Sequence, residues 1–386
     1  MSPAPGWNRL AATLPFLRAL TIWLASRAVV VLGAAFGRIY IAYGQGDWDP
    51  GAQWYHRLLR WDSEWYNIIA SQGYSFNGDI NVTQTVVFYP LFPLLARGLA
   101  DITGLPTTDA LLIVANVTAV AAILLLFKLV RDEFGDRIAL LTVALLSFFP
   151  TSMFLSAGYT EAPVLLWIVG FFLMVRRQWF FAAAVLAGLA AGTRSSGVML
   201  LPVLLLELWR HREPRLFARD VVPLALLSTA GLWLYMIYLG VTFGRPLALA
   251  EAQAAFQGGT NLPQRLIGAL TLQPFRALNL TEASPSGLDH WIFLIVIVLI
   301  VRAWFKLDPA MTLFALLVLL LPYLTVSGGP QGLVAMGRYN LVSFPLFIVA
   351  AMLLDRALWL TPAVIGLGGG LLFFYAALFS QSQWVG

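Results

Sequence analysis

The chain consists almost from end to end of apolar stretches long enough to cross a lipid bilayer. About 20 apolar residues in a row span the hydrocarbon core as a helix. Of the 386 residues, 60% are hydrophobic and only 11% are charged, whereas a soluble protein carries about a quarter charged residues. Backbone amides cannot stay unpaired in lipid, and the alternating pattern of barrel strands is absent from the sequence, so the spans must be helical. The predicted fold class is an all-α polytopic membrane protein.

Eleven apolar segments are candidates for spans in a single domain covering residues 1–386. They are residues 20–43, 108–129, 138–155, 161–175, 179–193, 197–209, 221–243, 290–304, 309–326, 339–354 and 361–380. The short segments 179–193 and 197–209 could instead form one broken or re-entrant segment.

The basic residues orient these spans. If the N-terminus is cytoplasmic, most lysines and arginines fall in short inner loops and most acidic residues fall outside, as the positive-inside rule requires. The two long loops, 44–107 and 244–289, then face outward, and we expect the function on the extracytoplasmic face. Arginine-rich inner loops and the alanine and proline content favour a bacterial plasma membrane. The net charge of +5 is spread over loops and indicates topology, not nucleic-acid binding.

Residues 54–72 carry charged side chains among tryptophans and tyrosines. Apolar residues recur every three or four positions, which predicts one amphipathic helix, Trp54–Gln72, at the membrane interface. On an unbroken helix Asp62 and Glu64 point about 160° apart, so both cannot act on one substrate. We favour Asp62 for chemistry and Glu64 for support. Alternatively, Asp62 caps a helix that begins at Ser63 and pairs with Arg60 or Arg57.

Four other segments combine polar residues with apolar flanks. In "VVFYPLFPLL" (86–95), Tyr89 either anchors the chain at the interface or forms a groove for a lipid tail. Glu161 follows Tyr159 at the edge of a span and either pairs with a membrane arginine or orients an acceptor. Arg194, at the outer end of a span, either reaches lipid headgroups or binds a phosphate. Arg338 and Tyr339 favour a phosphate site, and the preceding "SGGPQG" (327–332) could gate a pocket.

Several site classes are excluded. The chain has no cysteine, so it forms no disulfide and carries no thiolate nucleophile. Its three histidines are isolated in the sequence, and no metal-ligand cluster, P-loop or nucleophile elbow is visible.

The segments "RWDSEWYNIIASQGYSF" and "FYPLFPLL" resemble the PIG-V family, the second mannosyltransferase of GPI-anchor assembly, and its bacterial relatives. "GYTEA" (158–162), "TRSSG" (193–197) and "GRYNLVSFPLF" (337–347) also look like family segments, in the family's order. An insertion-like "NGDINVTQT" departs from the pattern and could reshape the acceptor side.

The resemblance implies a GT-C glycosyltransferase fold and a polyprenyl-phosphate mannose donor, without cofactor or metal. It implies an essential acid in the first outer loop, with catalytic candidates Asp62 and Glu64. Candidate substrate-binding residues are Arg60, Trp61, Tyr89, Tyr159, Glu161, Arg194, Arg338 and Tyr339. The expected reaction is mannose transfer with inversion, with Asp62 as general base.

Two questions stay open at this point. The acceptor could be a glycolipid, a lipoglycan or a protein. The competing function is a transporter or flippase of a lipid-linked sugar, which predicts inverted repeats and mid-membrane charges. No internal repeat is visible, and the acids gather at the outer surface, so the transferase is favoured.

Overall fold

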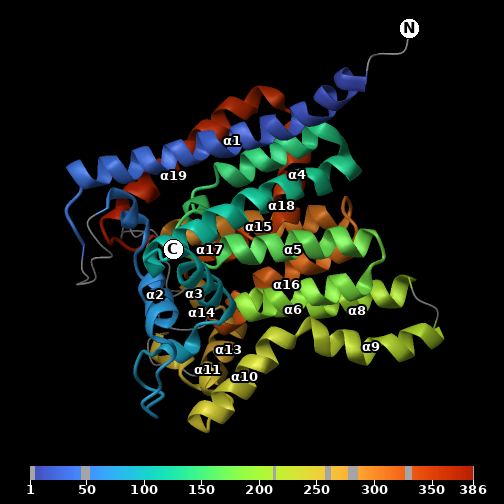
Figure 1. Ribbon diagram of the computed structural model, residues 1–386. Coiled ribbons are helices and arrows are strands. Elements are labelled where there is room, and N and C mark those ends of the chain that lie inside the picture. Colours follow the sequence, from blue (N-terminus) through green and yellow to red (C-terminus); the bar gives the residue numbers. More distant parts are fainter. Residues whose placement is uncertain are drawn as a thin grey trace.

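The computed structural model describes residues 5–44, 53–211, 214–256, 262–276, 286–326 and 333–385. Over these ranges every regular element is a helix, which confirms the all-α fold class. The longer helices cross the molecule, and shorter helices gather at one end (Figure 1). We call this the α2 end; it includes α2 (Asp62–Gln72), α3 (Leu91–Thr103), α13 (Leu262–Leu270) and α17 (Met336–Asn340).

Helix α1 (Pro5–Tyr40) packs along α19 (Thr361–Ser380), so two segments far apart in the sequence lie side by side (Figure 1). The contact face of α1 carries Gly33 and Gly37. A Cβ atom at Gly33 would lie 2.3 Å from the carbonyl oxygen of Phe373, and one at Gly37 would lie 2.3 Å from that of Ala377. Glycines at this spacing allow two helix backbones to approach closely in a membrane.

A single methyl group at Gly37 is therefore expected to push the two helices apart. In Gly37→Ala the new Cβ meets backbone atoms that cannot rotate away, and we expect a loss of about 1–3 kcal/mol of stability. Gly366→Ala on α19 is the matched control, because a Cβ there meets nothing within 4 Å. Thermal unfolding of both variants in detergent measures the difference. An unchanged unfolding temperature for Gly37→Ala would contradict the tight contact.

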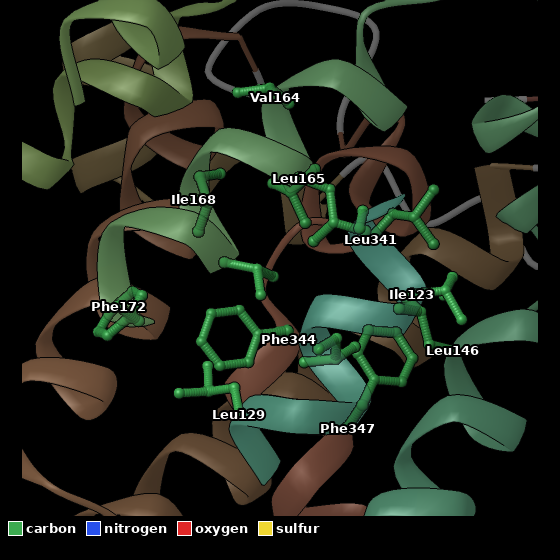
Figure 2. Packing of buried hydrophobic residues seen from close by; sticks show 14 of the residues in the cluster. Ile123, Leu129, Leu146, Val164, Leu165, Ile168, Phe172, Leu341, Phe344 and Phe347 are labelled. Atoms are coloured by element: carbon green, nitrogen blue, oxygen red, sulfur yellow. The ribbon is translucent and has the colours of Figure 1, made fainter. Parts of the chain in front are cut away.

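The core lies between α4 (Thr107–Ser147), α5 (Glu161–Arg176) and α18 (Phe344–Asp355). Figure 2 shows side chains from these helices packed against one another, among them Phe172, Phe344 and Phe347. The rings of Phe172 and Phe344 meet edge to face with centroids 5.2 Å apart. Lipid is as apolar as these side chains, so close packing stabilises this core more than exclusion of water does.

The eleven predicted apolar segments fall on helices of unequal length. Three helical stretches, Thr13–Tyr40, Thr107–Ser147 and Leu358–Ser380, are each long and apolar enough to cross a membrane. A fourth span results if α9 (Pro214–Ser228) and α10 (Ala230–Phe243), bent by 57°, count as one. The chain is thus an integral membrane protein, and the number of eleven spans stays a prediction.

Kinks divide two parts of this set. Element α4 consists of two helices that meet at Gly135, where φ is 84° and ψ is 170°, so the predicted spans 108–129 and 138–155 lie on opposite sides of this kink. The span 221–243 bends at Thr229. The hydroxyls of Ser228 and Thr229 donate to the carbonyl of Ala225, 2.8 and 3.1 Å away, and such bonds often bend helices.

The remaining helices are η1 Trp54–Leu58, η2 Thr85–Val87, η3 Ser152–Leu155, α6 Phe180–Thr193, α7 Ser195–Val198, α8 Leu200–His211, α11 Ala248–Glu251, α12 Gln253–Phe256, α14 Gln273–Arg276, α15 Ser286–Trp304, α16 Pro309–Thr325 and η4 Leu358–Leu360.

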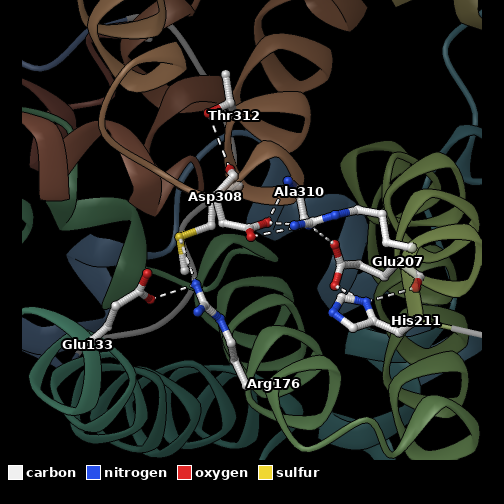
Figure 3. Close-up of polar contacts among 9 residues, drawn as sticks. Glu133, Arg176, Glu207, His211, Asp308, Ala310 and Thr312 are labelled. Atoms are coloured by element: carbon white, nitrogen blue, oxygen red, sulfur yellow. Dashed lines mark hydrogen bonds and ion pairs between the residues drawn. The ribbon is translucent and has the colours of Figure 1, made fainter.

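Ion pairs join helix ends on the side away from the α2 end (Figure 3). Arg176 at the end of α5 pairs with Glu133 of α4 at 2.6 Å. Arg210 of α8 pairs with Glu207 at 2.6 Å and with Asp308 at 3.1 Å. Asp308 also caps α16 by accepting from the amide of Ala310 at 2.9 Å. Glu133, Arg176, Arg210 and Asp308 come from loops predicted to face inward. Arg176 lies at the opposite end of α5 from Glu161, and a helix of 16 residues is about 24 Å long.

The predicted single helix over Trp54–Gln72 is wrong. The 3₁₀-helix η1 ends at Leu58, the backbone then turns sharply, and α2 begins at Asp62. Tertiary contacts hold this break: the hydroxyl of Tyr159 donates to the carbonyl of Arg60 at 3.0 Å, and Ser63 donates to the carbonyl of Gly158 at 3.1 Å. Local periodicity does not reveal such long-range partners.

The face of α2 that packs against the protein is only partly apolar. Ser63, Tyr66, Ile69 and Ala70 face the protein, whereas Trp61 is exposed. The placement of this helix at a membrane interface stays a prediction.

Candidate active site

Four charged side chains from four distant segments meet at the α2 end. Glu161, the first residue of α5, binds two arginines through one oxygen: its Oε1 lies 2.5 Å from Nη1 of Arg194 and 2.5 Å from Nε of Arg338. Arg338, on α17, also binds Asp62, with 2.6 Å between Nη2 and Oδ2. The result is a chain of alternating charges, Asp62–Arg338–Glu161–Arg194.

Burial differs along this chain. The side chain of Glu161 is fully buried and that of Arg338 is 7% exposed, whereas that of Asp62 is 27% exposed. Two acids and two arginines balance, which a buried ionic cluster requires, because an unpaired charge in an apolar interior is very unfavourable. Asp62 is therefore the more exposed of the two acids in this cluster.

Two cavities meet at Asp62. The larger, of about 800 Å³, is lined by Glu64, Trp65, Asp289 and Trp384 among others. The smaller, of about 350 Å³, is lined by Arg194, Ser196 and Arg265, with apolar residues of α16 on one side. Asp62, Arg338 and Tyr339 line both. The Asp62–Arg338 ion pair therefore stands at the boundary between the two cavities.

Tyr159 helps to hold the Asp62–Arg338 ion pair in position. Tyr159 is fully buried, and the guanidinium of Arg338 lies over its ring, 4.5 Å from the centroid. The hydroxyl of the same tyrosine holds the carbonyl of Arg60, two residues before Asp62. One aromatic side chain thus fixes both members of the ion pair.

Asp289, in the first turn of α15, helps to position Arg338 from the other side. Its carboxylate accepts hydrogen bonds from the backbone amides of Ala335 and Gly337, at 2.9 and 3.1 Å. Burial raises the pKa of Asp289 to about 6, although these amides favour the ionised form. Sequence reasoning did not select this residue, and its place directly before an apolar span was the available signal.

We expect transfer activity to fall as the pH drops through about 6. Above that pH the ionised Asp289 accepts both amides and holds α17 in place, and protonation weakens these bonds. In Asp289→Asn the amide cannot accept both bonds equally well, so activity should be lower and its step near pH 6 should disappear. The pH–rate profiles of the two proteins test this. A step unchanged in Asp289→Asn would assign it to another group.

The pH dependence that Asp289 gives to the stability of the protein should be opposite to the pH dependence that it gives to activity. A carboxyl whose pKa is raised by folding stabilises the protein most below its unfolded pKa of about 3.9. That contribution is lost as the pH rises through about 6. Activity and stability therefore have opposite pH trends at this residue, which separates its role from simple acid unfolding.

The structure brings seven of the ten predicted site residues to the cavities. Trp61, Asp62, Glu64, Arg338 and Tyr339 line the larger cavity, and Tyr89 and Arg194 line the smaller. In the described part of the chain, Arg60, Tyr159 and Glu161 lie behind these walls and are buried. Their predicted contact with substrate stays a prediction, and their position favours a supporting role.

Asp62 and Glu64 line the same cavity, which the predicted single helix did not allow. Helical periodicity placed them on opposite sides of one helix, yet both line the larger cavity. The reason is that α2 begins at Asp62, so both carboxyls lie in its first turn beside a wide opening. Burial raises the pKa of Glu64. Only Asp62 of the two also reaches the smaller cavity.

Two further predictions concern gating and metals. The predicted gating loop 327–332 lies outside the described residues. Within the ranges described, no three histidine, aspartate or glutamate side chains lie close enough to hold a metal ion. Independence from metals stays a prediction.

Comparisons with known proteins identify relatives. Residues 89–240 match the family described as dolichyl-phosphate-mannose-protein mannosyltransferase. The chain is 35% identical over 153 residues to GPI mannosyltransferase 2 of Cryptococcus neoformans var. neoformans serotype D (strain JEC21), covering 36% of this chain and 34% of that protein. It is 27% identical over 226 residues to GPI alpha-1,6-mannosyltransferase 2 of Rattus norvegicus, covering 54% and 44%. The chain spans less than half the length of these curated relatives.

A solved structure shares the fold. The oligosaccharyltransferase of Archaeoglobus fulgidus in the apo form superimposes with a TM-score of 0.50 at 14% identity, covering 95% of this chain and 56% of that one. This likeness concerns the fold alone. The resemblance to the PIG-V family, predicted from short motifs, is confirmed by the sequence matches.

Proposed function

We propose that this chain, a relative of GPI mannosyltransferase 2, transfers mannose from a polyprenyl-phosphate donor to an extracytoplasmic acceptor with inversion. The observation that carries the proposal is the position of Asp62. Its carboxylate lines two cavities and is oriented by Arg338. A general base must lie within reach of both the attacking hydroxyl and the carbon under attack.

The two cavities suit two different substrates. The smaller one is lined by three arginines and by apolar residues of α16, including Val318 and Leu321, a combination that suits a phosphate attached to a lipid. The larger one is lined by Glu64, Asp289 and three tryptophans. Its carboxylates can accept hydrogen bonds from sugar hydroxyls. We assign the smaller cavity to the donor and the larger one to the acceptor.

The chemistry is a single displacement at the anomeric carbon. The acceptor oxygen forms a bond to this carbon while the bond to the phosphate oxygen breaks, and Asp62 takes the hydroxyl proton. The polyprenyl phosphate leaves with one more negative charge than it carried in the donor. Guanidinium groups fixed beside the leaving oxygen stabilise this charge most in the transition state, which lowers the barrier. Attack from the face opposite the phosphate inverts the configuration.

The orientation in the membrane follows from the two ends of the molecule. Basic residues such as Arg176 and Arg210 lie on the side away from the α2 end, and the positive-inside rule places that side in the cytoplasm. The α2 end, with both cavities, then faces outward from a bacterial plasma membrane. The whole chain, 1–386, is proposed to act as one such unit.

The direct test uses purified protein in lipid nanodiscs with radiolabelled polyprenyl-phosphate mannose and glycolipid, lipoglycan or peptide acceptors. Label recovered on an acceptor supports the transferase. In sealed vesicles, a labelled donor that moves between leaflets without mannose transfer would favour the alternative of a flippase. The relatives reported above are named as transferases and lend no support to that alternative.

A further inference from the structure

The smaller cavity contains a buried arginine, and the described residues leave two of its hydrogen-bond donors without a partner. Arg265, on α13, is 4% exposed, and its Nε and Nη1 atoms have no hydrogen-bond partner among the residues that the structure describes. Arg194 and Arg338, on the same cavity, are both bound to Glu161. A buried guanidinium with unmatched donors is very unfavourable, and an anion would satisfy it.

A second buried donor points to the same place. The hydroxyl of Ser196 has no hydrogen-bond partner in the described part of the chain, although the residue is 6% exposed and lines this cavity. Buried polar atoms without partners are rare in native proteins and often mark a binding site. Burial also lowers the pKa of Arg265, and a bound anion would favour its charged form.

Arg265 is held in position by the neighbouring helix. The hydroxyl of Tyr323 on α16 donates to the carbonyl of Ala269 on α13 at 2.8 Å. Val318, Leu321 and Pro322 of α16 form the apolar side of the same cavity. The guanidinium of Arg265 and the apolar wall therefore lie on two helices joined by a hydrogen bond, and Ser196 lines the same cavity from α7.

From this arrangement we infer that Arg265, together with Ser196, binds the phosphate of a lipid-linked substrate. This rests on the proposed function and changes one assignment within it: Arg194 and Arg338 hold the carboxylates, and Arg265 binds the phosphate. The apolar wall favours an isoprenoid phosphate over a water-soluble nucleotide sugar or free phosphate. Arg265 lies in the second predicted outer loop, outside any recognisable motif, so the sequence alone did not reveal it.

The test measures equilibrium binding of a C55 polyprenyl phosphate, without sugar, to the full chain in nanodiscs. Loss of a charge-assisted hydrogen bond costs roughly 1.5–3 kcal/mol, so Arg265→Gln should weaken binding about 10- to 100-fold. Arg265→Lys keeps the charge but loses the planar fork and should show an intermediate loss. The matched control is Arg245→Gln, which removes an arginine that is half-exposed and paired with Glu251.

The outcomes separate the possible explanations. Binding of the uncharged polyprenol and the unfolding temperature should be the same in Arg265→Gln and wild type, which a merely structural arginine would not allow. If Arg265→Gln binds polyprenyl phosphate within twofold of wild type, the inference is wrong. If inorganic phosphate or GDP-mannose competes as well as the lipid does, the conclusion that the bound phosphate belongs to a lipid would be wrong. Arg265-dependent binding in a wild-type protein that transfers no mannose would overturn the proposed function but not the phosphate site.

Discussion

Replacing Asp62 by asparagine is expected to abolish mannose transfer while leaving the protein folded. A carboxylate base contributes about 10²- to 10⁴-fold to a rate, and an amide cannot accept the hydroxyl proton. Asparagine keeps the shape of the side chain and can still accept a hydrogen bond from Arg338, which also keeps its ion pair with Glu161. The rate under saturating donor should fall by that factor, with little change in donor affinity.

Glu64→Gln is the matched control for Asp62→Asn. Glu64 lies two residues away on the same helical turn but lines only the larger of the two cavities. We expect Glu64→Gln to raise the KM for the acceptor and to lower the turnover number by less than tenfold. Turnover near wild type in Asp62→Asn, with loss in Glu64→Gln, would move the base to Glu64.

Replacing Glu161 is expected to destabilise the protein more than any other change considered. Glu161 is fully buried and shared by Arg194 and Arg338. In Glu161→Gln two buried guanidinium groups lose their shared counter-ion, and breaking a buried pair typically costs about 3–5 kcal/mol. Arg338 would then keep Asp62 as its ion-pair partner but lose the buried one, so transfer should be lost at temperatures where the protein is still folded.

The control here is Glu133→Gln on the other side of the molecule. Glu133 also pairs with an arginine, Arg176, at 2.6 Å, but the two side chains are 26% and 38% exposed. Exposed pairs contribute about 0–1 kcal/mol, so this variant should unfold near the wild-type temperature. Thermal unfolding monitored by circular dichroism compares the two. Equal shifts for Glu161→Gln and Glu133→Gln would mean that the shared acid is not a stabilising centre.

The sequence was sufficient for the class of protein and for the position of the site along the chain. Apolar stretches of spanning length predict helices because lipid leaves the backbone no alternative. A polar residue inside such a stretch is unfavourable without a partner, which is why Glu161, Arg194 and Arg338 could be selected as related residues before their contacts were known. The partnership of Glu161 with an arginine, one of two readings, is what the structure shows.

What the sequence could not supply was the local path of the chain around Asp62. The periodicity of residues 54–72 fits one helix, whereas the structure has a break held by contacts with Gly158 and Tyr159, nearly a hundred residues away. Asp289 and Arg265 were missed for a similar reason. Each looks like an ordinary loop residue until the fold brings it beside Arg338 or into the smaller cavity.

The two arginines that share Glu161 lie far apart in the sequence, so they reach the site at different times during biosynthesis. Asp62 and Glu161 leave the ribosome first, and Arg194 follows after one further helix. Arg338 emerges only after α15 and α16 have been inserted. Until then, Arg194 is the one of the two arginines available to neutralise Glu161, and Asp62 lacks the partner that orients it. Arg338 therefore completes the charge cluster late in synthesis, when of the longer helices only α18 and α19 are still to follow.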